Sequence, residues 1–136
     1  MNTTSRQLLH TADLLVGADG APATTHPVTG VPTLFTATAA SRCRGAAFAL
    51  RAALESAIAD RLTAHGVPRA IREGSMRAAL LWLRDCVEAE TARRAKAVWS
   101  RLCLGCHYHQ YEIGPTEDQV RAWRAEVVAV IALLAR

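Results

Sequence analysis

The sequence predicts an all-α protein, an antiparallel bundle of four to five helices, from its alanine content and the spacing of its apolar residues. Of the 136 residues, 27 are alanine and only 5% are aromatic. Alanine loses no side-chain freedom when a helix forms, and it is the best helix former. Apolar residues recur three and four positions apart, as on one face of a helix. Long helices with short later loops favour an antiparallel bundle.

Residues 1–40 are predicted to hold one helix and a connector. Leu9, Ala12 and Val16 lie at helical spacing within about residues 5–16, and Gly17 ends this helix. The remainder is rich in proline, glycine and threonine, which is typical of an irregular connection. Residues 41–136 are expected to form the helical-bundle domain.

Three further helices are expected before residue 112. A long one covers about residues 39–64 and ends at HGVP (65–68). Its apolar stripe consists of Cys43, Ala47, Leu50, Leu54, Ala57, Ile58 and Leu62. The next begins between Ala70 and Ser75, and another runs through ARRAKAVWSRLCLGCHYHQY.

The last helix has the clearest start signal. Thr116 and Gln119 match a capping box, in which each side chain bonds the other residue's free backbone N–H. Glu117 and Asp118 favour the positive end of the helix dipole. The stripe that follows should pack into the core: Val120, Trp123, Val127, Val130, Ile131 and Leu134.

The chain is expected to be soluble and cytoplasmic. It shows no signal peptide and no run approaching the roughly 20 apolar residues of a membrane span. Its four cysteines are therefore expected to be thiols in a reducing compartment. Residues 42–101 hold 12 Lys/Arg against 6 Asp/Glu, a net charge of +6. Such a surface suits an anionic partner such as nucleic acid, or is simply the solvated side of basic helices.

Residues 99–112, WSRLCLGCHYHQYE, concentrate the reactive side chains and allow several interpretations. Cys103-Leu-Gly-Cys106-His107 has the spacing of a c-type haem attachment motif, but such haem is attached outside the cytosol. A metal site from Cys103, Cys106, His107 and His109 is a weak alternative, and we expect no bound metal or other cofactor. At 100° per residue one helix face cannot present all four ligands, so another helix would have to complete the site. Small apolar packing is the simplest role for the cysteines.

The spacing from Arg101 to His107 resembles the R-x(4–6)-H signature of the HEPN superfamily. HYHQYEIGPT and RGAAFALRAALES extend the resemblance, which covers about residues 41–136. The segment is also similar to C-H-x-H-x-Y-E-L-x-P-T in small bacterial proteins of unknown function. The resemblance implies a bundle that dimerises and cleaves RNA without metal, with Arg101 and His107 as the catalytic residues.

Two features depart from that pattern. Leu102 follows the arginine, where many HEPN nucleases have a polar residue. Six residues also turn an ideal helix by about 600°, which leaves Arg101 and His107 about 120° apart. Gly105 could relax the helix between them, or a second subunit could complete the geometry.

The supporting residues of this site are expected to be His109, Tyr111, Arg51 and Glu55. The non-catalytic alternative treats His107, His109 and Tyr111 as a polar cluster that joins helices. Arg51 and Glu55 are then its partners across the bundle, or an exposed i,i+4 ion pair. The chain would in that case be a HEPN-like dimerisation or partner-binding module.

Overall fold

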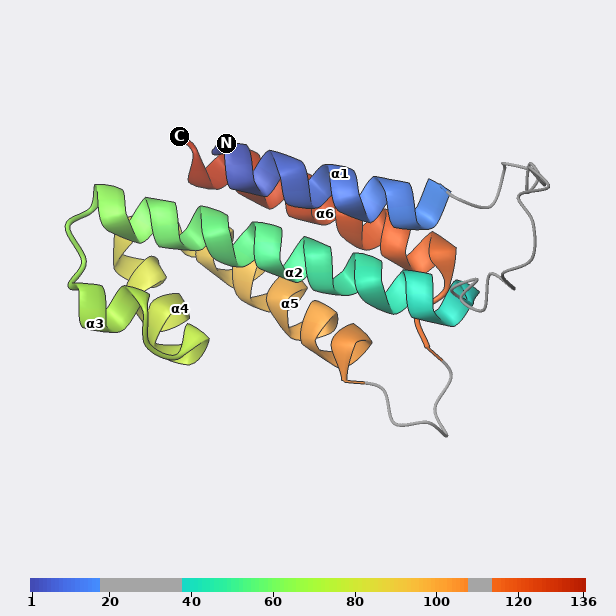
Figure 1. The fold of residues 1–136 in the computed structure, drawn as a ribbon. Coiled ribbons are helices and arrows are strands. Elements are labelled where there is room, and N and C mark those ends of the chain that lie inside the picture. The colour runs from blue at the N-terminus through green and yellow to red at the C-terminus, as the bar shows by residue number, and fades with distance from the viewer. Residues whose placement is uncertain (18–37, 108–113) are drawn as a thin grey trace.

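A computed structural model of the chain describes residues 1–17, 38–107 and 114–136 (Figure 1). About 84% of these residues are helical and none of them lies in a strand, which confirms the predicted all-α class. The helices of the described residues are α1 (Thr3–Gly17), α2 (Ala39–Ala64), α3 (Arg69–Arg72), α4 (Met76–Cys86), α5 (Ala89–Cys106) and α6 (Glu117–Leu134).

The longest helix, α2, is the centre of the molecule, and it packs against each of the other five described helices. α1 and α5 run in the direction opposite to α2, and α3 and α4 lie together at one end (Figure 1). The apolar stripe predicted for α2 is buried along its whole length. The largest fully buried aliphatic side chains are Leu50, Leu54, Ile58, Leu62, Leu83, Leu102, Ile131, Val120, Val127 and Val130.

α2 ends at the HGVP sequence, as predicted, in a Schellman motif. Gly66 has a φ of 69°, a left-handed conformation that glycine adopts without a steric penalty. The Val67 N–H donates to the Leu62 carbonyl at 3.0 Å, and the Gly66 N–H donates to the Thr63 carbonyl at 3.0 Å. Val67 is buried and closes this end of the core.

α6 begins with the predicted capping box. The Gln119 N–H donates to Thr116 Oγ1 at 3.2 Å, and the Thr116 N–H donates to Gln119 Oε1 at 3.0 Å. The predicted stripe of α6 is buried except at Trp123, which is only half-buried.

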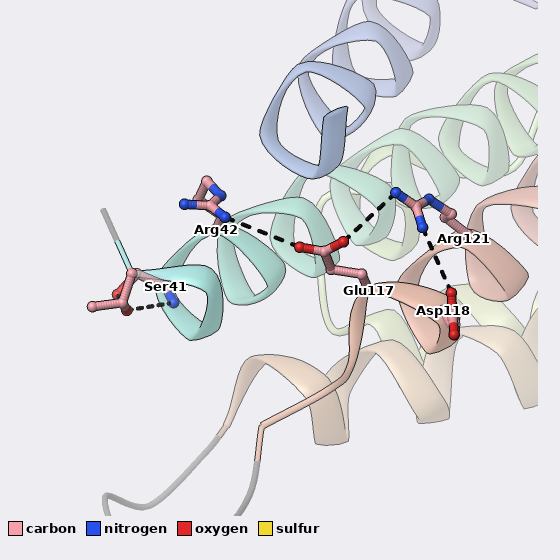
Figure 2. A network of polar contacts seen from close by, with 6 residues as sticks. Ser41, Arg42, Glu117, Asp118 and Arg121 are labelled. Atoms are coloured by element: carbon pink, nitrogen blue, oxygen red, sulfur yellow. Dashed lines mark hydrogen bonds and ion pairs between the residues drawn. The ribbon is translucent and has the colours of Figure 1, made fainter. Parts of the chain in front are cut away.

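A chain of ion pairs connects the start of α6 to the start of α2 (Figure 2). Glu117 lies 4.0 Å from Arg42 of α2 and 3.6 Å from Arg121, which in turn lies 3.6 Å from Asp118. These contacts are at the end of the molecule where α5 ends (Figures 1 and 2). They therefore help to fix the helices around the candidate site.

α1 packs directly on α2 and contributes Leu9, Ala12 and Val16 to the common core. The Ser5 hydroxyl, which is fully buried, donates to the Ala53 carbonyl at 3.1 Å. Within residues 1–17, 38–107 and 114–136, no helix combines the length and the hydrophobicity that crossing a membrane requires.

Candidate functional site

The reactive segment begins on α5 and leaves it within the C-x-x-C-H motif. α5 ends at Cys106, and His107 is its C-cap, with its backbone N–H donating to the Cys103 carbonyl at 3.1 Å. The helix expected to run on to Tyr111 is therefore shorter than predicted, and the prediction was wrong at this end. Glycine, histidine and tyrosine favour a helix less than the alanine-rich sequence before them, which is consistent with an end here. His109 and Tyr111 lie outside the described residues.

Arg101 and His107 are both exposed at the C-terminal end of α5. Neither side chain forms a hydrogen bond or an ion pair with any of the residues that the structure describes. Arg101 lies within α5, whereas His107 is the C-cap and has left the helical conformation, with φ −101° and ψ 58°. One copy of the chain thus presents both groups to solvent, and the structure describes no contact between them.

Arg51 and Glu55, the two supporting residues on α2, form a half-buried cluster with α5 rather than a contact with His107. Arg51 Nε lies 3.4 Å from Glu55 Oε1, and the Trp99 indole N–H donates to the same oxygen at 2.8 Å. The Arg51 guanidinium carbon also lies 5.2 Å from the centroid of the Phe48 ring. The pair is therefore partnered across the bundle by the indole of Trp99, which was not among the predicted site residues.

Trp99 could have been found from its register. It precedes Cys103 by one helical turn, so the two residues share a side of α5, and Glu55 is one turn beyond Arg51 on α2. A tryptophan in such a position usually finds an acceptor for its N–H when it is buried. What was missing from the sequence was the knowledge that these sides of α2 and α5 pack together.

Cys103 and Cys106 lie on the inner part of α5, half-buried and buried respectively. Burial raises the pKa of the Cys103 thiol above its usual value, although the neighbouring Arg51 guanidinium opposes this shift. Burial also raises the pKa of Cys106, again against Arg51. The thiolate is the form that binds metals and attacks electrophiles, so both residues are in a state suited to packing.

The structure gives no support to the alternative of a metal site in the ranges that it describes. Within 1–17, 38–107 and 114–136 no three His, Cys, Asp or Glu side chains are grouped so that they could hold an ion. The fourth ligand of that alternative, His109, lies outside these ranges. Cys106 is 5% exposed, so its sulfur is also poorly placed for attachment of a haem group.

Gly105 allows α5 to approach both α2 and α6. A Cβ at this position would lie 2.7 Å from Trp123 Cζ3 and 3.5 Å from Ala47 Cβ. Gly105 is part of the regular helix, so its role here is close packing rather than the relaxation that the sequence suggested. The indole of Trp123 holds this turn of α5 in place, two residues before His107.

Comparisons of the chain with models of known protein families, with curated protein sequences and with solved structures gave no match. The resemblance to HEPN proteins therefore continues to depend on the sequence motifs alone.

Proposed function

We propose that this HEPN-like chain is a metal-independent endoribonuclease that acts as a homodimer, with Arg101 and His107 as its catalytic residues. His107 would accept the proton of an RNA 2′-hydroxyl as that oxygen attacks the adjacent phosphorus. Histidine suits this role because it titrates near neutral pH. Arg101 would bind the phosphate oxygens through its planar, permanently charged fork.

The observation that supports this proposal is that one pair of polar residues is engaged in contacts within the fold, whereas the pair of Arg101 and His107 is not. Arg51 and Glu55 are occupied by each other and by Trp99. The side chains of Arg101 and His107 are exposed and have no partner within the described part of the chain. They are therefore available to a substrate, and the fold does not depend on them.

The direction of the two side chains supports the dimer. A six-residue step on an ideal helix would leave them about 120° apart, so the His107 of one copy would act beside the Arg101 of a second copy. His107, protonated in that step, would then donate the proton to the leaving 5′ oxygen. The P–O5′ bond then breaks, and the products are a 2′,3′-cyclic phosphate and a 5′-hydroxyl.

Cleavage of single-stranded RNA by the purified chain tests the proposal. We expect activity in EDTA, cyclic phosphate ends, and a loss of about 10²–10⁴-fold in rate for His107→Ala. Arg101→Lys should also lose activity, because a point charge does not replace a bidentate fork. His10→Ala and Arg44→Lys are matched controls, because both residues are exposed and have no partner in the described ranges. Full activity of His107→Ala would refute the proposal.

Mixing two inactive variants tests the shared site. A heterodimer of Arg101→Ala and His107→Ala contains one composite site in which both groups are intact. Partial recovery of cleavage on mixing is expected. If both groups act within one chain, the mixture stays inactive, because neither chain has the complete pair.

The alternative is a non-catalytic module that dimerises or binds a partner protein. The cluster of Arg51, Glu55 and Trp99 favours it to the extent that polar residues near the candidate site are used to join helices. A chain that forms dimers but leaves RNA intact would support this alternative.

A further inference from the structure

A groove of about 880 Å³ lies between α4 and α5, away from the C-terminal end of α5. Of the helices that the structure describes, these two line it, along α5 from Ala89 to Ser100. At 1.5 Å per residue, this wall is about 17 Å long, or three helical turns. In Figure 1, α4 lies beside the beginning of α5 at the end of the molecule opposite the start of α2.

The groove is lined with apolar side chains that water still reaches. Leu80, Leu81 and Trp99 line it, together with alanines of α5. Leu81 is 63% exposed and Trp99 is half-buried, whereas Leu80 is buried. A concave apolar surface with large exposed side chains is typical of an interaction site.

The sides of the groove are basic. Arg77 and Arg84 line it from α4 and Lys96 from α5, and none of the three forms an ion pair with a residue in the described ranges. Arg93 also lines the groove, but it pairs with Glu90. Asp85 is the one acidic residue among the lining residues. The site therefore favours a partner that carries negative charge.

We propose that the α4–α5 groove binds an acidic amphipathic helix of a partner protein. The apolar face of such a helix would cover Leu81 and the exposed part of Trp99, and acidic residues on its two edges would meet Arg77, Arg84 and Lys96. A helix of about three turns matches the length of the wall, and helix-in-groove binding is a common mode of peptide recognition. This inference is independent of the ribonuclease proposal.

The lining of the groove favours a protein helix over single-stranded RNA. RNA binding in such a groove depends on aromatic rings on which bases stack, next to cations that follow the phosphates. Here the apolar part of the lining consists of two leucines, two alanines and Trp99. Trp99, the aromatic residue of the lining, is half-buried and its N–H is already donated to Glu55. The apolar lining and the basic residues on the two sides of the groove together match a helix with one apolar face and acidic edges.

Binding of designed helical peptides to the full chain tests this inference. The probe is a fluorescent peptide of about 12 residues with leucines on one face and glutamates on both edges, followed by anisotropy. The double variant Arg84→Glu/Lys96→Glu should weaken its binding at least about tenfold, because like charges then meet. Leu81→Ala should also weaken binding, and it is not expected to unfold the protein because Leu81 is exposed.

A matched control reverses two charges elsewhere. Arg6→Glu/Arg44→Glu changes the net charge equally at exposed residues of α1 and α2, and it should bind the peptide like the wild type. A peptide with lysine edges should prefer the Arg84→Glu/Lys96→Glu variant. No saturable binding of the acidic peptide, or equal binding by both double variants, would overturn the inference. Binding of a uridine oligonucleotide that depends on Arg84 and Lys96, without peptide binding, would overturn it in favour of nucleic acid.

Discussion

Along the last two turns of α5, residues packed in the core alternate with residues in water. Leu102, Gly105 and Cys106 are buried, whereas Arg101, Leu104 and His107 are exposed. The two sets share one short stretch of sequence rich in chemically reactive residues. The buried residues are accounted for by packing in the core. Candidates for a chemical role in this stretch are therefore the exposed residues.

The largest difference is expected between Leu102→Ala on the buried side of α5 and Leu104→Ala on its exposed side, in the free energy of unfolding. Leu102 is fully buried, so Leu102→Ala should lower the free energy of unfolding by about 2–5 kcal/mol, through lost transfer energy and a cavity. Leu104 is 75% exposed, and Leu104→Ala should change it by less than about 0.5 kcal/mol. Urea denaturation of both variants measures this. Equal losses would mean that the two sides of α5 are not distinguished as described.

Substitution of Gly105, on the buried side of α5, should have an intermediate effect on the free energy of unfolding. The added methyl of Gly105→Ala would lie within 3.0 Å of the Trp123 ring, so the indole must move. We expect a loss of about 1–3 kcal/mol in unfolding free energy, despite the better helix propensity of alanine. Gly17→Ala is the control, because among the described residues no atom beyond its own helix backbone and chain neighbours lies within 4 Å of its added carbon. A Gly105→Ala variant more stable than wild type would show that α5 and α6 are not in close contact there.

Loss of the hydrogen bond between Trp99 and Glu55 should have the smallest effect on the free energy of unfolding. A double-mutant cycle of Trp99→Phe and Glu55→Ala should give a coupling of about 1 kcal/mol, the usual net contribution of one hydrogen bond. The exposed pair of Arg69 and Glu73 is the comparison, where Glu73→Ala should cost less than about 0.5 kcal/mol. Thermal melts at matched pH give both values. A coupling near zero would show that the hydrogen bond between Trp99 and Glu55 does not stabilise the fold.

The sequence was sufficient for features that depend on neighbours along the chain. The stripe of α2, the stop at Gly66 and the capping box of Thr116 each follow from spacings of a few residues, and the structure confirms them. Trp123 was expected in the core and is only half-buried, because its ring lies over Gly105 at the edge between α5 and α6.

Features that depend on which helices meet were not predictable in the same way. The registers of Trp99 and Glu55 do not say that these sides of α5 and α2 pack together, and nothing local indicates that α4 and α5 leave a groove between them. Gly105 did carry a signal, because a glycine inside a helix costs about 1 kcal/mol relative to alanine and often has a packing reason. The end of α5 at Cys106 was missed because no glycine or proline that would signal a stop follows it before Gly114.

The central position of α2 has a consequence for how the protein opens. α2 packs on every other described helix, so its backbone N–H groups become accessible only when all of these interfaces separate. Its amides should therefore exchange with deuterium at the rate of global unfolding. α3 is four residues long and has no buried residue, so its amides should exchange through local fluctuations while the remainder stays folded.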